Sequence, residues 1–173
     1  MTDALLEDFL NYSAEKLRQL GGRIETCLGT LTEEQIWARG SENENAIGNL
    51  VLHLCGNVRQ WIVSGIGGAP DERQRDREFA ARGRVAGPEL AERLRTVVAE
   101  ATTVLDGVSA ERMAQRVTVQ KYEMTVLSAI YHVVEHFSGH TGQIIFATKM
   151  LTGSDLGFYR HLSAAAAHSE KTP

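Results

Sequence analysis

Hydrophobic positions recur along the chain at steps of three, four and seven residues, which is the period of an amphipathic α-helix. Four such segments are long: residues 3–29, about 45–65, a segment that begins at Gly87-Pro88, and about 124–151. Val117-Thr118-Val119 is too brief to predict more than an extended connection. Four long helical periods without a credible strand predict an all-α fold, a four-helix bundle.

Local signals define several ends of these helices. Thr32 to Gln35 fits the capping-box pattern and predicts a short helix after the first long one. Thr125 is suited to cap the last long helix, and Gly153 is suited to end it. Gly21-Gly22 lies inside the first helix, where two glycines favour a kink or a break.

Length and composition favour one globular domain. The chain has 173 residues and 43% hydrophobic content, enough to bury a sizeable core. We expect a single domain over residues 1–166 and a loose C-terminal tail over residues 167–173.

Charge and cysteine usage limit the partners and the compartment. The net charge of −4 arises from interspersed acids and bases, so we expect no nucleic-acid partner. No uncharged apolar run approaches the ~20 residues of a membrane span, and the acidic start MTDALLEDF does not resemble a signal peptide. Cys27 and Cys55 belong to no C-x-x-C pair, which favours a cytoplasmic protein with free thiols, although a single disulfide stays open.

The segment Asp71–Glu78, DERQRDRE, alternates charge almost residue by residue. Four acids against three arginines predict a solvated helical face or loop rather than a phosphate site. An inward arginine that meets a substrate is the alternative.

Three of the six histidines, His132, His136 and His140, recur every fourth residue in the last long helix. An i,i+4 pair on a helix can close on one metal ion. The outer two lie roughly 12 Å apart along the axis, so all three cannot share one ion. His136 belongs to both of the pairs that remain.

A further histidine, His53, lies among leucines in the second long helix, with Asn57 and Trp61 at four-residue steps after it. Helix bundles build metal sites from facing helices, and one ligand from this helix with two from the last would leave an open fourth position. The alternatives are a hydrogen-bonded core histidine at His53 and a polar stripe in a bundle seam. Trp61 fits a core residue better than a substrate wall. The absence of Glu-x-x-His pairs argues against a di-iron site.

The stretches NAIGNLVLHLCGNVRQWI and YHVVEHFSGHTGQII together resemble the DinB/YfiT-like superfamily of metal-dependent enzymes. The loop DERQRDREF and the tail DLGFYRHL resemble an uncharacterised branch of it. The resemblance implies an up-down-down-up four-helix bundle, often homodimeric, with His53, His136 and His140 as metal ligands. His132 would then support a ligand or line the pocket. Gly139 departs from the commoner pattern, which has a further histidine there.

The resemblance also implies a chemistry. Related enzymes transfer a low-molecular-weight thiol to an electrophile, and one is a mycothiol-dependent isomerase. We therefore expect a thiol transferase that uses a divalent ion (Zn, Ni, Fe or Mn), with a small thiol and an electrophile as partners. The alternatives are a metal-dependent hydrolase and a non-catalytic metal-binding or dimerising helical module. Asn57 and Gln143 are placed to orient the ligand, whereas Gly139 and Gly142 predict close approach of a neighbour or ligand.

Overall fold

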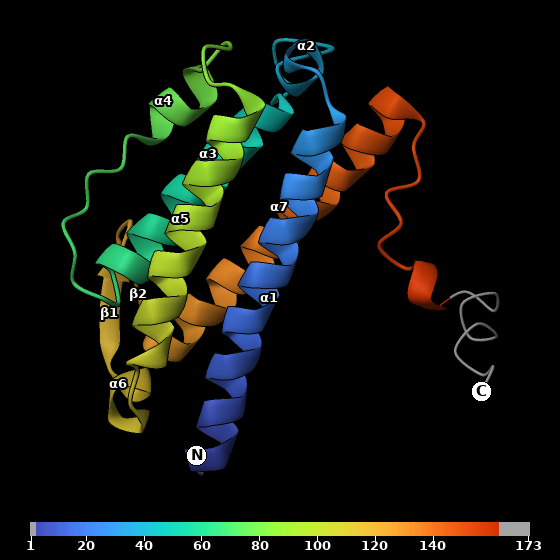
Figure 1. Ribbon diagram of the computed structural model, residues 1–173. Helices are drawn as coiled ribbons and strands as arrows, with labels where there is room; N and C mark the ends of the chain where they lie inside the picture. The colour runs from blue at the N-terminus through green and yellow to red at the C-terminus, as the bar shows by residue number, and fades with distance from the viewer. Residues whose placement is uncertain (1–2, 163–173) are drawn as a thin grey trace, which may run out of the picture.

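The computed structural model describes residues 3–162 and is built around four long helices. They are α1 (Asp3–Thr30), α3 (Ile47–Val58), α5 (Gly87–Asp106) and α7 (Val126–Thr152). Among the long helices, α1 packs against α5 and α7, and α3 packs against the same two helices. Figure 1 shows α1 and α7 running in one direction and α3 and α5 in the other, which confirms the up-down-down-up bundle. The expected loose tail at 167–173 lies outside the described residues.

Short elements connect the long helices. They are α2 (Glu33–Ile36), the π-helix η1 (Arg59–Ser64) that continues α3, α4 (Arg75–Ala80), α6 (Ala110–Ala114) and the 3-10 helix η2 (Arg160–Leu162). Because α3 and α5 are parallel, residues 65–86 must return along the whole length of the bundle, and they carry α4 on the way (Figure 1).

The predicted helix ends agree closely with the structure. Thr32 and Gln35 form the capping box of α2. Thr125 caps α7 by accepting a hydrogen bond from the backbone of Ser128, and Gly153 ends α7 with a φ of 66°. The chain does not break at Gly21-Gly22, because α1 passes through both glycines as one helix.

The expectation of no strand is also wrong in one place. A two-stranded antiparallel hairpin precedes α7, with strands β1 (Arg116–Val119) and β2 (Tyr122–Thr125). Val117 and Val119 are buried in the core, while Arg116 and Thr118 are exposed. The turn residues Gln120 and Lys121 both have positive φ, 51° and 71°, a conformation that asparagine or glycine usually supplies. Neither of those residues is present, so the sequence carries no hairpin signal.

The core fills the space between the four helices. Its largest fully buried side chains come from every long helix and include Leu17, Leu54, Leu94 and Phe137. Both cysteines are free thiols, and burial raises the pKa of Cys27 and raises that of Cys55 to about 12. Over residues 3–162, no helix is both long and apolar enough to cross a membrane.

Candidate metal centre

Two rows of side chains at four-residue steps face each other across α3 and α7. Since the two helices are antiparallel, His53 on α3 meets His136 and His140 on α7, with ring centres 5.1 Å away in both cases. Two turns further along, the Trp61 ring lies 4.5 Å from the ring of His132. The four-residue steps seen in the sequence therefore become one seam lined by imidazoles.

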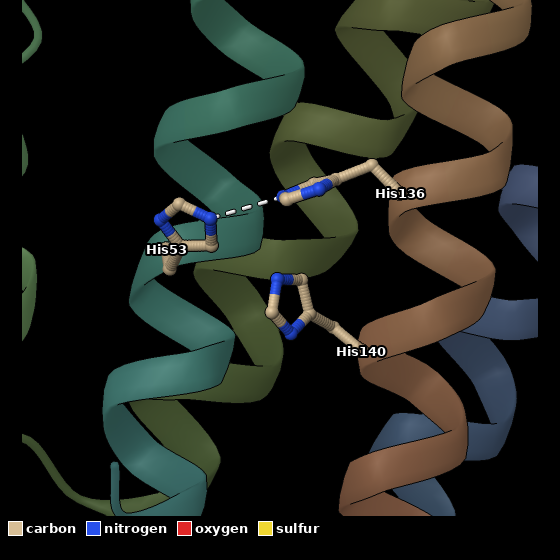
Figure 2. Close-up of side chains that lie close together, drawn as sticks. All are labelled: His53, His136 and His140. Atoms are coloured by element: carbon tan, nitrogen blue, oxygen red, sulfur yellow. Dashed lines mark hydrogen bonds between the residues drawn. The ribbon is translucent and has the colours of Figure 1, made fainter. Parts of the chain in front are cut away.

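His53, His136 and His140 form a compact cluster whose rings converge (Figure 2). Each offers one ring nitrogen within 4.8 Å of the others, and the two Nε2 atoms of His53 and His136 are 3.0 Å apart. Ligand nitrogens of a tetrahedral zinc ion lie roughly 3.3 Å apart when each bond is about 2.0 Å. The three histidines are thus close enough to hold one metal ion.

Hydrogen bonds set the orientation of two of these rings. His53 Nδ1 lies 3.0 Å from the Glu78 carboxylate and 3.1 Å from Arg73 Nη2, and His140 Nδ1 lies 2.7 Å from the Gln143 amide oxygen. Because both oxygens can only accept, they favour the tautomer with the proton on Nδ1, which is the usual arrangement of a metal-binding histidine and its oxygen partner. The tautomers favoured at His53 and His140 therefore suit a metal ion, and a hydrogen bond joins the Nε2 atoms of His53 and His136 in this structure.

Glu78 is itself held by Arg73. The guanidinium donates from Nε to Oε1 and from Nη2 to Oε2, both at 2.8 Å, and a third bond joins it to Gln60. The side chains of Arg73 and Glu78 are only 4% and 11% exposed. We predicted a solvated face or loop for residues 71–78, and this prediction is wrong at Arg73 and Glu78. Arg73 points inward, as the alternative prediction required, and its contact with a substrate stays a prediction. Pairing compensates the burial of both charges.

The backbone that carries Glu78 is fixed to α3 by Asn49. The Asn49 amide donates to the backbone oxygens of Glu78 and Ala81 at 2.8 and 3.0 Å, and its own oxygen accepts from Arg39. Gly56 leaves room for the carboxylate, since a Cβ built there would lie 2.0 Å from Glu78 Oε1. The carboxylate therefore approaches α3 at a position that only glycine allows.

The cluster supplies neutral imidazoles next to a compensated carboxylate. Burial, reinforced by the neighbouring histidines, lowers the pKa of His136 to about 4, and burial likewise lowers the pKa of His140. Burial alone would raise the pKa of Glu78, but hydrogen bonds from Arg73 and His53 outweigh it and lower that pKa. At neutral pH the two α7 histidines are therefore in the form that binds metals, and Glu78 is ionised.

A pocket of about 410 Å³ opens beside this cluster. Its wall is formed by α3 with η1, the start of α4, the hairpin and α7; the lining residues are His53, Asn57, Trp61, Arg73, Arg75, Gln120, Tyr122, Met124, His132 and His136. The unpredicted hairpin thus supplies one side of the pocket. Its turn residue Gln120 donates to Gln60, which also accepts from Arg73.

Two buried polar atoms in this wall have no hydrogen-bond partner among the described residues: Asn57 Oδ1 and Trp61 Nε1. The two residues are 4% and 2% exposed. Leaving such an atom unsatisfied costs about 1–3 kcal/mol, so a native protein keeps it for a reason. Trp61 is a core residue, as its apolar surroundings predict, and it also lines the pocket.

The remaining site candidates occupy different places. His132 lines the pocket, and its ring stacks on that of His136 at 5.6 Å. Gln143 does not line the pocket and bonds His140 instead. The close approach of a neighbour predicted at Gly139 and Gly142 is wrong within the described chain, since a Cβ at either would meet nothing within 4 Å. The approach of a ligand there stays a prediction.

Arg73 and Glu78 are the residues whose part in the site the sequence did not reveal. Their alternating charges have the same pattern as a solvated surface. One usable signal is Gly56, a glycine in the interior of an apolar helix one turn from His53, since such a glycine often marks close approach of another group.

The fold and the histidine cluster define a class. A conserved protein from Enterococcus faecalis shares the fold with a TM-score of 0.68 and 16% identity, over 83% of this chain and 97% of that one. A DinB-like protein from Bacillus cereus matches with a TM-score of 0.65 and 16% identity, over 84% of this chain and 91% of that one. A mutant of the mycothiol-dependent maleylpyruvate isomerase matches with a TM-score of 0.57 and 13% identity, over 83% of this chain and 63% of that one. The chain therefore has the DinB/YfiT-like fold that its sequence resembles.

A family model described as a protein of unknown function (DUF1572) matches residues 5–167. The match spans most of the chain, so this protein belongs to that family. No curated protein sequence matches it.

Proposed function

We propose that His53, His136 and His140 bind one divalent metal ion, and that the protein is an enzyme that transfers a low-molecular-weight thiol to an electrophile. The observation that carries the proposal is the convergence of three ring nitrogens within 4.8 Å, with His53 and His136 also lining a pocket. Three protein ligands leave a fourth position for a substrate, as in catalytic zinc sites. Zinc, nickel, iron and manganese all accept imidazole ligands.

A divalent ion at this position supplies a Lewis acid that lowers the pKa of a bound thiol and holds its anion. The chain's residues do the rest. Glu78 and Gln143 keep the Nδ1 protons of their histidine partners in place. His132 lines the same pocket next to His136 and is positioned to accept the proton that the thiol loses.

The pocket favours a thiol over water as the nucleophile. None of its lining residues is a carboxylate, and Glu78 is engaged by His53 and Arg73. A thiol has a pKa near 8.5 and water one near 15.7, so a thiol loses its proton with far less help from a base. We therefore prefer the transferase to the hydrolase. One protein of similar fold is named mycothiol-dependent; at 13% identity that likeness shows the fold alone and is consistent with the proposal.

Elemental analysis tests the metal centre. We expect about one divalent ion per chain in the wild type and little in His136→Ala, with His132→Ala as the matched control that keeps its ion. Equal metal content in wild type and His136→Ala, including none in both, would overturn the proposed centre.

Activity then separates the chemistries. The purified protein is assayed with several thiols and a chlorinated aromatic electrophile, with and without Zn²⁺ or Ni²⁺. Metal-dependent disappearance of the thiol supports the transferase. Hydrolysis of ester or amide substrates without thiol use would favour the hydrolase, and an ion that only raises the melting temperature would favour a non-catalytic module.

Homodimer formation and a cytoplasmic location are proposals of the same kind. Light scattering after gel filtration measures the first, and fractionation of the source cells measures the second.

A further inference from the structure

Arg75 is a solvent-exposed cation in the pocket wall that forms no ion pair with a carboxylate of the described chain. It begins α4 and lines the same pocket as His53 and His136. Within residues 3–162 it makes no ion pair, and its recorded contact is with the Phe79 ring, whose centre lies 4.8 Å from its guanidinium carbon. By contrast, Arg73 in the same wall is neutralised by Glu78.

The Phe79 ring also fixes how far this cation lies from the histidines. Its centre is 4.8 Å from the ring centre of His53. The Arg75 guanidinium therefore lies no farther from the His53 imidazole than twice that distance. Both groups line the same pocket, so a molecule that spans this distance can contact both.

The rest of the wall also favours an anion. No carboxylate lines the pocket, so nothing there repels a negative charge. A guanidinium donates charge-assisted hydrogen bonds to a carboxylate.

We propose that Arg75 binds the carboxylate of a small substrate, so that the thiol this site takes is a carboxylate-bearing one. The pocket of about 410 Å³ is within the size range of small-molecule sites. This inference rests on the proposed function for the thiol end of the molecule, and on Arg75 for the carboxylate end.

The test compares mercaptopropionate with mercaptopropionamide, which has the same size without the charge. Cobalt-loaded protein is titrated with each, and binding is followed by the thiolate-to-cobalt absorption band. We expect the carboxylate to bind at least tenfold more tightly in the wild type, and Arg75→Gln to remove that preference. Arg77→Gln is the matched control, because Arg77 lies on the same short helix but does not line this pocket.

The experiment distinguishes failure of the carboxylate site from failure of the proposed thiol function. Equal affinity for the two probes in the wild type, or an unchanged preference in Arg75→Gln, overturns the carboxylate site while the cobalt band persists. If no probe produces the band, the thiol function fails. Calorimetric titration of the metal-free protein then tests the carboxylate site alone. The carboxylate site requires that mercaptopropionate bind more tightly than its amide and that Arg75→Gln abolish this difference.

Discussion

Replacing Glu78 by glutamine separates its two effects on the protein. The substitution removes the charge that accepts the His53 Nδ1 proton and that compensates Arg73, whose side chain is 4% exposed. Removing one partner of a buried ion pair costs about 3–5 kcal/mol. Glutamine keeps the shape and one acceptor oxygen, and Gln60 still accepts from Arg73, so we expect a loss of about 3 kcal/mol in the free energy of unfolding.

The effect on metal binding is separate. A carboxylate that orients a metal-binding histidine is typically worth 10–100-fold in affinity. We therefore expect Glu78→Gln to bind Zn²⁺ about 10–100-fold more weakly, measured by competition with a chromogenic chelator. Urea unfolding of the metal-free protein, followed by circular dichroism, measures the stability.

The double variant Arg73→Met/Glu78→Met distinguishes the two effects. Apolar side chains of similar size often replace a buried ion pair at no cost, so stability should return to within about 1 kcal/mol of wild type. The affinity for Zn²⁺ should stay low, because His53 still lacks its carboxylate. Glu100→Gln is the control: its ion pair with Arg59 is exposed, and its loss should cost less than about 1 kcal/mol with no change in affinity. Wild-type affinity in both Glu78 variants would refute the orienting role.

Three further predictions follow from the same geometry. Gly56→Ala should weaken Zn²⁺ binding as Glu78→Gln does, because the added Cβ would displace the Glu78 carboxylate. Chelator competition measures the affinity, and Gly22→Ala is the control because nothing lies within 4 Å of a Cβ there. Equal affinity in the two variants would contradict the prediction. Gly22→Ala itself should raise the free energy of unfolding by up to about 1 kcal/mol, and a fall in the urea midpoint would contradict it. The pKa of His136 is lowered from 6.5 to about 4 in the folded state, so the unfolded chain binds a proton at higher pH than the folded one. The metal-free protein should therefore lose at most about 3 kcal/mol of stability as pH falls from 6.5 towards 4. Urea titrations measure this loss, and it should be smaller in His136→Gln.

Periodic features of the sequence predicted the fold and the histidines that meet. The helices have long apolar stripes, and their ends carry capping residues such as Thr32 and Thr125, so local chemistry suffices. The four-residue steps of the α7 histidines place them on one face of a helix whatever surrounds it. The choice of His53 as their partner required the bundle topology, which the family resemblance supplied.

The features that the sequence did not reveal depend on contacts distant along the chain. Glu78 reaches His53 across 25 positions, and only a folded return segment brings them together. The hairpin is four residues per strand, and its turn, Gln120-Lys121, has positive φ values that these residue types rarely adopt. Its formation reflects burial of Val117 and Val119 rather than a local turn preference.

The bundle topology explains why the site includes a loop. In an up-down-down-up arrangement the second and third helices are parallel, so the chain between them must travel the full length of the bundle. Here that obligatory return, residues 65–86, passes over the α3 histidine and carries Arg73 and Glu78 to it. Gln60 of η1 then links Arg73 to the hairpin turn, so the return segment and the hairpin are joined beside this imidazole. A segment that the topology already requires thus supplies the carboxylate that orients His53.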